Sequence, residues 1–218
     1  MPIKPLLLFA ALLTYVSFTG CNQQVSIQDS PLLAYFQPTS LADTLLLELP
    51  AETDKIDEGD TIPRALFFQS LGKLMQAVDY IADSTSSVVV GRARFTLNQT
   101  YDACLVDITQ FWFKHQSLLL YNKQTQAFTD RVTVAEWYGG DGGQVLTGSW
   151  LTDYDGDGQK DLVRRVIEHA MLISEDNEPL EKFDESAELL LWQKNSFVKT
   201  PLQDSVLLIK KYPIRSVW

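Results

Sequence analysis

The nine residues Asp153–Asp161, DYDGDGQKD, contain four aspartates and two glycines. Asp153, Asp155 and Asp157 occupy alternate positions, and Asp161 follows four positions later. Short carboxylates on a tightly turning backbone point inward, and Ca²⁺ takes six to eight oxygen ligands at about 2.3–2.6 Å. The spacing therefore predicts one calcium site in this loop.

The same nine positions match the start of an EF-hand loop, with Gly158 at the sixth position, where the chain must turn sharply. The twelfth position is Arg164, however, where an EF-hand needs a bidentate Glu. The flanks 150–153 and 162–167 also have the residue pattern of strands rather than helices. We therefore exclude an EF-hand and predict a loop between two strands.

The form D-x-D-x-D-G-x-x-D between two strands resembles the calcium loops of FG-GAP and related propeller-type repeats in bacterial surface proteins. The resemblance covers about residues 140–170. It implies that Asp153, Asp155, Asp157 and Asp161 bind Ca²⁺ through their side chains and that Gln159 contributes a backbone oxygen. The ion would then have a structural role.

Two other interpretations of the loop remain open. Mg²⁺ prefers rigid octahedral sites that retain water, so it is the weaker metal candidate. A solvated turn without metal is the other alternative, but four like charges within nine residues would repel one another. His169, Glu168 and Asp141 are the nearest groups with acid–base chemistry, and they form no known catalytic pattern. We therefore predict no catalytic residues and no enzymatic activity.

The first residues, MPIKPLLLFAALLTYVSFTGC, have the dimensions of a signal peptide. Lys4 precedes an apolar run from Leu6 to Phe18, which is shorter than the roughly 20 residues that cross a bilayer. The ending Phe18-Thr19-Gly20-Cys21 resembles the lipobox of bacterial lipoproteins, although Phe18 replaces the usual Leu. The resemblance implies a signal peptide over residues 1–20 and an acyl (palmitate) anchor on Cys21.

Asn22 follows Cys21, so the Asp that retains such lipoproteins in the inner membrane is absent. We therefore expect the protein in the cell envelope, anchored to the outer membrane. Ordinary secretion with an unmodified Cys21 is the alternative. The formal net charge of −10 disfavours a nucleic-acid partner, because phosphate binding needs clustered Lys and Arg.

Length and composition favour one domain behind the leader, since 218 residues with 45% hydrophobic content bury a sizeable core. We expect a lipid-anchored tether over 21–60 and a β-rich calcium-binding domain over 61–218. Residues 61–81 carry apolar side chains at helical spacing and predict the N-terminal helical segment. Gly72 interrupts the pattern, so two short helices are the alternative to one. The polar stretch 174–186 predicts a long exposed loop, and 207–218 a final strand or a docking segment.

From Val88 onward the apolar pattern has period two, which predicts antiparallel hairpins. Cys104, Val106 and Ile108 alternate as one buried strand face. The predicted fold is mainly β with a minor helical part, an irregular propeller-like or sandwich domain. The four predicted hairpins are 88–98 with 103–109, the two arms of 115–138 around the turn 122–126, 144–154 with 161–173, and 187–200 around the turn 194–196.

In outline, a lipobox followed by such a domain resembles lysozyme-inhibitor-like and toxin-immunity lipoproteins of bacteria. No inhibitory motif of those proteins is present, so the resemblance implies only a macromolecule-binding module. The alternative is an accessory glycan-binding lipoprotein that uses the aromatic residues Trp137, Tyr138, Trp150 and Tyr154. The expected partners are the membrane, through the anchor, and an envelope protein or glycan.

Overall fold

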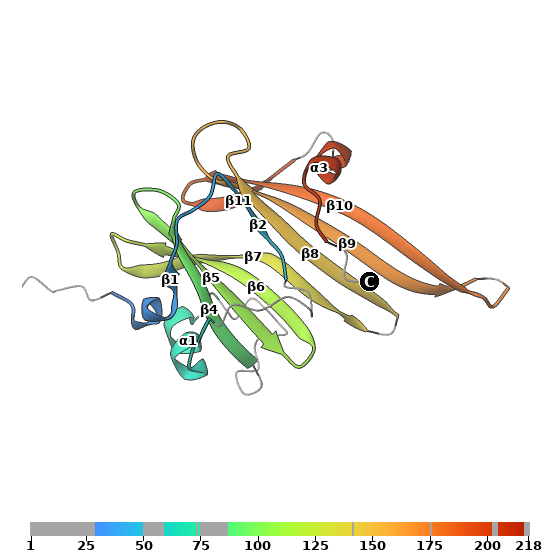
Figure 1. Cartoon of the computed structure of the whole chain (residues 1–218), viewed down its shortest axis with the longest axis horizontal. Helices are drawn as coiled ribbons and strands as arrows, with labels where there is room; N and C mark the ends of the chain where they lie inside the picture. Colours follow the sequence, from blue (N-terminus) through green and yellow to red (C-terminus); the bar gives the residue numbers. More distant parts are fainter. Residues whose placement is uncertain are drawn as a thin grey trace, which may run out of the picture.

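The structure is a computed structural model that describes residues 29–49, 59–72, 74, 87–140, 142–174, 176–201 and 205–215. The predicted signal peptide 1–20 and the predicted lipidation site Cys21 lie outside these residues. No described helix is long and apolar enough to cross a membrane. The described chain is mainly β, as the period-two pattern predicts, and Figure 1 shows its strands as one broad twisted layer that curls around a core.

The helices and strands occur in the following order. They are η1 (Pro31–Tyr35, a 3₁₀ helix), β1 (Gln37–Pro38), β2 (Thr44–Leu47), β3 (Asp60–Thr61), α1 (Arg64–Leu71), β4 (Ser87–Thr96), β5 (Tyr101–Gln110), β6 (Phe113–Asn122), β7 (Ala127–Gly140), β8 (Gly143–Thr152), β9 (Asp161–Ile173), β10 (Pro179–Gln193), β11 (Ser196–Thr200) and α3 (Ser205–Lys211).

The described strands form one mixed sheet of 11 strands. Its main path runs β1-β4-β5-β6-β7-β8-β9-β10-β11, so all four predicted hairpins are confirmed. The short strands add three pairings between distant segments: β1 lies parallel to β4, β3 pairs with β4, and β2 pairs with β8. Consecutive antiparallel strands therefore build most of the sheet.

The sheet divides into two halves that face each other. β7 and β8 pair only between Glu136–Gly140 and Gly143–Thr147, and β2 then takes the far part of β8. Beyond that point β4–β7 and β8–β11 diverge, and apolar side chains from both halves fill the space between them. We call this set the central core: Leu47, Phe95, Tyr101, Ala103, Leu118, Leu120, Val134, Leu151, Leu162, Leu190, Trp192 and Phe197.

A second core lies between β4–β6 and the N-terminal helices. Cys104, Val106 and Ile108 all point into it and are at most 1% exposed, which confirms the predicted buried face. η1 contributes Leu32 and Leu33 to this core, so part of the segment 21–60 belongs to the folded domain rather than to a tether. Burial of these leucine side chains removes apolar surface from water, which stabilises the packing of η1 against the sheet.

Two sequence predictions need correction in the described residues. The predicted helical segment is not one of them: α1 ends at Leu71, before Gly72, whose φ of 43° is a left-handed value that favours glycine, and residues 73 and 75–81 lie outside the described part of the chain. The predicted exposed loop 174–186 is wrong from Pro179 onward, because β10 begins there and pairs with β9. The predicted final strand near residue 207 is the helix α3, which packs Leu208 against the sheet.

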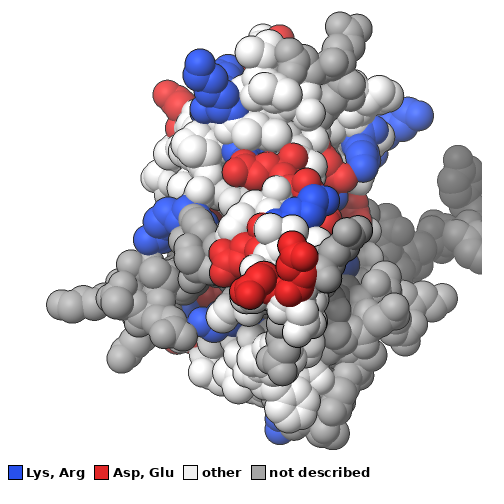
Figure 2. Space-filling model, turned by 90° about the vertical axis from the view of Figure 1, so that its right-hand side faces the viewer, with Lys and Arg blue, Asp and Glu red and all other residues white. Residues whose placement is uncertain are grey.

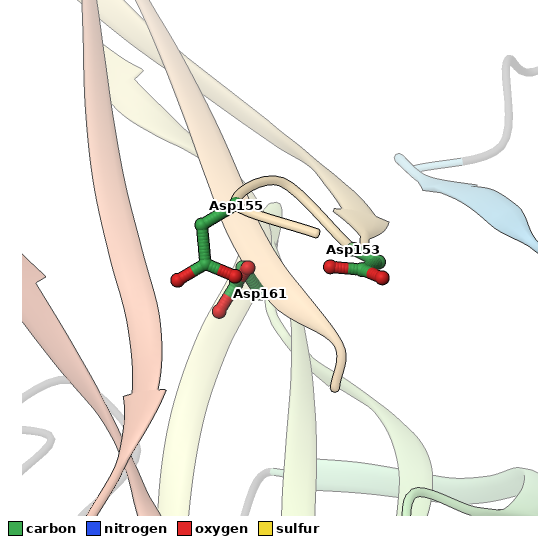
Figure 3. Close-up of side chains that lie close together, drawn as sticks. All are labelled: Asp153, Asp155 and Asp161. Atoms are coloured by element: carbon green, nitrogen blue, oxygen red, sulfur yellow. The ribbon is translucent and has the colours of Figure 1, made fainter. Parts of the chain in front are cut away.

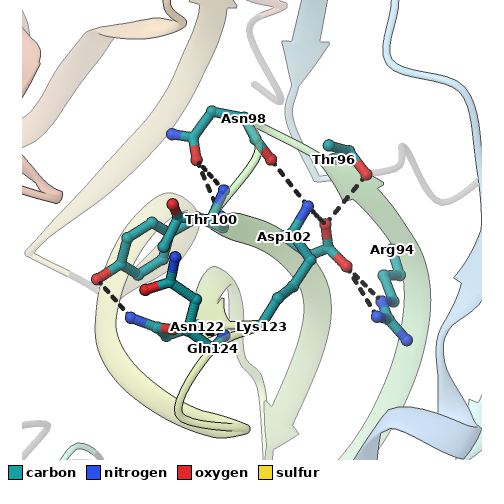
Figure 4. A network of polar contacts seen from close by, with 9 residues as sticks. Arg94, Thr96, Asn98, Thr100, Asp102, Asn122, Lys123 and Gln124 are labelled. Carbon is teal, nitrogen blue, oxygen red and sulfur yellow. Dashed lines mark hydrogen bonds and ion pairs between the residues drawn. The ribbon is translucent and has the colours of Figure 1, made fainter.

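An ion network fixes the turns at one end of the sheet (Figure 4). Asp102, which is 4% exposed, accepts hydrogen bonds from Arg94 Nε (2.9 Å) and Thr96 Oγ1 (3.0 Å) and lies 3.2 Å from Lys123 Nζ. Lys123 in turn donates to the carbonyl of Asn98 (2.8 Å), so one buried carboxylate connects the β4–β5 and β6–β7 turns. Burial alone would raise the pKa of Asp102, but the hydrogen bonds from Arg94, Lys123 and Thr96 outweigh it and lower that pKa.

Candidate metal centre

The aspartate loop joins the end of β8 to the start of β9. Both flanks are strands, as predicted, so the loop is not an EF-hand. Gly156 and Gly158 have φ values of 81° and 84°. Only glycine adopts such angles without steric cost, so the two glycines explain how the backbone turns twice within nine residues.

Three of the predicted ligand side chains converge (Figure 3). One carboxylate oxygen from each of Asp153, Asp155 and Asp161 lies within 4.8 Å of the others. Two oxygens bound to the same Ca²⁺ are at most about 5 Å apart, since each lies about 2.3–2.6 Å from the ion. The three oxygens therefore fit around one cation. Asp155 is exposed, Asp153 is half-buried and Asp161 is buried.

The Asp157 carboxylate is not part of this converging group. It accepts hydrogen bonds from the backbone N–H of Gln159 (2.8 Å) and from its side-chain amide (3.0 Å), and Asp157 is exposed. The structure therefore brings together three of the four aspartate side chains that the sequence singled out, and the backbone oxygen of Gln159 stays a prediction.

Backbone N–H groups orient the converging carboxylates. Asp153 accepts from Gly156 N (2.8 Å) and Gly158 N (3.0 Å), one on each oxygen. Asp161 accepts from Tyr154 N (3.0 Å) within the loop and from Trp192 N (2.8 Å) on β10. A carboxylate has about four acceptor positions, so these contacts leave lone pairs for a metal. The carboxylates are thus held in place before any cation binds.

The electrostatics of the loop favour a cation. Burial raises the pKa of Asp161, the hydrogen bonds from Trp192 and Tyr154 lower it, and the negative charges of Asp155 and Asp157 raise it further, with a net upward shift. Within the described part of the chain, no Lys or Arg forms an ion pair with these aspartates. A bound divalent cation would supply the missing positive charge.

The other acid–base candidates lie elsewhere. His169 stacks on Phe183 of β10, with ring centroids 4.6 Å apart, close to the end of β9 that points away from the loop. Glu168 is the exposed neighbour of His169, and Asp141 lies outside the described residues. Neither His169 nor Glu168 adds a catalytic group to the aspartate loop.

A buried polar cluster that the sequence did not reveal surrounds His115. His115 Nε2 lies 2.6 Å from Ser117 Oγ, and the opposite ring nitrogen lies 3.6 Å from the Glu136 carboxylate. Arg131 donates to Ser117 Oγ (3.1 Å) and to Thr133 Oγ1 (2.9 Å). The register of β6 and β7 places His115 opposite Glu136, and residue spacing alone cannot give that register.

Ser117, His115 and Glu136 contact one another in the order found in catalytic triads, in which a nucleophile contacts a base and the base contacts an orienting acid. Ser117 and His115 are only 0% and 2% exposed, however, and a substrate carbonyl has no path to a fully buried hydroxyl. Burial lowers the pKa of His115, the nearby Glu136 opposes this, and the net shift is downward. The cluster therefore holds β6 against β7 through satisfied polar groups.

Comparisons with protein families, characterised proteins and solved structures find no match to this chain.

Proposed function

We propose that the protein is a lipid-anchored cell-envelope protein whose β domain is stabilised by one structural Ca²⁺ and binds another macromolecule. The lipobox-like Phe18–Cys21 supports the anchor, and the converging carboxylates of the aspartate loop support the cation. The binding role is inferred from where the domain exposes its apolar side chains.

The observation that carries the binding role is the difference between the two ends of the sheet. The turns at the end that holds the aspartate loop are polar: 97–100, 123–126, 153–160 and 194–195. Among the described residues, nine of the thirteen exposed large hydrophobic residues lie toward the hairpin ends opposite to them. These nine are Val88, Phe111, Trp112, Tyr138, Met171, Leu172, Ile173, Leu180 and Phe183. Exposed apolar surface is typical of interaction sites.

The turn between β5 and β6 contains a residue with an unusual backbone conformation. Phe111 has a φ of 55°, a value that a bulky residue rarely adopts, and its side chain is 75% exposed. The adjacent Trp112 is 55% exposed. The Trp112 ring contacts that of Phe113, with centroids 4.9 Å apart, and a positive φ is usual in a two-residue hairpin turn, although glycine or asparagine is the common residue there. The exposure of the two rings therefore supports a binding role.

Affinity capture tests the binding role. The full-length protein, immobilised through an added C-terminal tag, is incubated with envelope extracts in Ca²⁺ and in EDTA. We expect a specific macromolecule to be retained by the wild type and lost from a Phe111→Ser, Trp112→Ser variant that unfolds at the same temperature. Capture of nothing by the wild type in either buffer would refute the binding role.

Membrane fractionation tests the anchor separately. Cys21→Ala removes the thiol that carries the lipid, so we expect the variant in the soluble fraction and the wild type with outer membranes. Cys104→Ala is the matched control because it removes the other cysteine. Equal fractionation of the wild type and Cys21→Ala would contradict the lipid anchor.

Glycan binding is the second candidate function, and one observation favours it. Phe111, Trp112 and Tyr138 are exposed at the same end of the sheet, where flat rings could stack on sugars. The four aromatics that the sequence singled out do not form one surface, because Tyr138 and Tyr154 lie toward opposite ends of β8. A glycan array with the wild type and Trp112→Ala distinguishes glycan from protein partners.

A further inference from the structure

The distal part of the β9–β10 hairpin projects beyond the rest of the sheet (Figure 1). β8 reaches β9 only as far as the pair Gly143–Ala170, and β11 covers β10 only from Leu189 to Gln193. The residues 171–173 and 179–181 therefore form a two-stranded ribbon with no third strand among the described residues. We call residues 168–174 and 176–185 the arm.

The arm exposes apolar side chains on both of its faces. Leu172 and Leu180 pair directly across the ribbon and share one face, with exposures of 45% and 52%. Met171 and Ile173 are on the other face and are 40% and 75% exposed. A two-stranded ribbon is only marginally stable in water. Its apolar surface is available to a partner rather than used for the protein's own core.

The outer edge of β10 offers backbone hydrogen-bonding groups along the arm. No described strand lies beside β10 between Pro179 and Glu188, because the pairs with β11 begin at Leu189. Open edges recruit further strands, and natural proteins block them with bulges, prolines or lysines. Pro179 has no backbone N–H, so the open part of this edge begins at Leu180. The only lysine on the arm, Lys182, forms an ion pair with Asp184.

The arm is strongly acidic. Between Glu168 and Glu185 the chain carries seven acidic residues and one lysine. The space-filling view toward this end of the molecule shows Asp and Glu gathered in the middle of the face (Figure 2). Glu181 and Asp184 are on the exposed part of β10, where its outer edge is open.

We infer that the arm binds a basic, extended polypeptide segment of another protein, which adds as a strand to the outer edge of β10. Backbone groups of β10 would pair with the segment. On one face its apolar side chains would cover Leu180, and on the other its Lys or Arg side chains would meet Glu181, in a negative field to which Asp184 adds. This inference rests on the proposed binding function and names its surface and the chemistry of its partner.

The negative charge of the arm disfavours two other partners, a second copy of this chain and an anionic lipid surface. Two copies that paired edge to edge would bring their Glu181 and Asp184 side chains together, and like charges across a strand pair are destabilising. An anionic lipid surface would be repelled for the same reason. The acidic groups therefore discourage self-association and favour a cationic partner.

The test uses a synthetic peptide of alternating Lys and Val, with Pro at each end to prevent its own aggregation. Its affinity for the full-length protein is measured by fluorescence anisotropy at low and high salt, beside a peptide of alternating Glu and Val. We expect salt-sensitive binding of the Lys peptide only, and slower hydrogen exchange in residues 179–186 when it is bound. Glu181→Lys with Asp184→Lys should weaken binding by about tenfold or more.

The matched control reverses two exposed acids away from the arm, Asp43→Lys with Asp60→Lys, and should bind the Lys peptide as the wild type does. Equal binding to the arm variant, or equal binding of the Glu peptide, would overturn the inference. Arm-dependent dimerisation, or arm-dependent binding to vesicles of anionic phospholipid, would overturn it in favour of those occupants. If the wild type still captures an envelope partner in any of these cases, the proposed function stands without the arm.

Discussion

Replacement of Asp161 by Asn tests the metal centre most directly, because Asp161 connects the aspartate loop to β10. With Ca²⁺ at a hundred times its dissociation constant, binding to the folded state alone adds about 2.7 kcal/mol to the free energy of unfolding. For a domain of this size that corresponds to a rise in Tm of roughly 5–11 °C. We therefore expect Ca²⁺ to raise the wild-type Tm by several degrees over its value in EDTA.

Asp161→Asn removes one negative ligand and one of two acceptor oxygens. The oxygens of Asp161 accept from Tyr154 N and Trp192 N, so the variant leaves one of these donors without its partner. An unsatisfied buried donor costs about 1–3 kcal/mol. In Ca²⁺ the variant should lose this amount and most of the calcium increment. In EDTA it should lose less, because it also removes a buried charge.

The pH dependence of stability is an independent test of the environment of Asp161. The pKa of Asp161 is raised above its ordinary value of 3.8, so the folded protein without Ca²⁺ binds a proton more readily than the unfolded chain. Stability from this group is present below pH 3.8 and is lost as the pH rises through the raised pKa. In EDTA the Tm of the wild type minus that of Asp161→Asn should therefore fall as the pH rises above 3.8 and through the raised pKa of Asp161.

In Ca²⁺ the same difference should rise with pH, because the ion binds the ionised carboxylate. Differential scanning calorimetry of both proteins in both buffers gives all four values. Asp176→Ala, which removes an exposed acid at the tip of the arm, is the control for general charge effects. A wild-type Tm that is equal in Ca²⁺ and EDTA, or an equal calcium increment in Asp161→Asn, would refute the metal centre.

Three further predictions follow from buried groups. Asp102→Asn should lower the free energy of unfolding in urea by about 1–3 kcal/mol, since charge-assisted hydrogen bonds from Arg94, Lys123 and Thr96 are weakened. Its deficit should shrink as pH falls below 3.8 through the lowered pKa of Asp102, and a deficit that does not vary with pH would contradict that shift. The lowered pKa of His115 predicts an NMR titration midpoint below 6.5 for this residue in the folded protein. Because the unfolded chain then protonates first, the free energy of unfolding should decrease as the pH drops below 6.5. A midpoint above 6.5 would be inconsistent with burial. Burial raises the pKa of the Cys104 thiol to about 12, so it should react with Ellman's reagent only after unfolding in guanidinium, and rapid reaction of the native protein would contradict its burial.

The hairpins could be predicted because one face of each strand is buried. The alternation of Cys104, Val106 and Ile108 follows directly from contact with the second core, and the polar turns separate one strand from the next. The strand flanks of the aspartate loop were predictable for the same reason. Local pattern suffices where neighbouring strands are also neighbours in sequence.

The start of β10 could not be predicted, because its residues 179–186 are exposed on both faces and show no alternation of apolar and polar side chains. Pairing with β9 gives their backbone N–H and C=O groups hydrogen-bond partners. Such pairing leaves no pattern of apolar residues in the sequence. The pairing of β2 with β8 joins segments about a hundred residues apart, so no local signal specifies it. α3 is too short for its period to be distinguished from that of a strand.

For the candidate site, the residue types were predictable and the geometry only in part. The sequence indicates the aspartates and the glycines, and it predicts Asp157 and Asp153 equally as calcium ligands. In the structure the Asp157 carboxylate is hydrogen-bonded to Gln159 instead. The cluster around His115 depends on the pairing of His115 with Glu136 on the next strand. A register of this kind becomes known only when the strands are in place.

The hydrogen bond from Trp192 N to Asp161 also has a consequence for how the chain folds. Alternate residues of β10 serve two different cores: Leu190 and Trp192 enter the central core, whereas Ala187 and Leu189 lie beneath α3. A slip of one residue between β9 and β10 would exchange these two sets. Because the carboxylate at the start of β9 accepts from one backbone N–H of β10, it fixes the alignment of a hairpin whose strands have 13 and 15 residues. The aspartate loop therefore favours the observed register of β9 and β10 over one slipped by a residue.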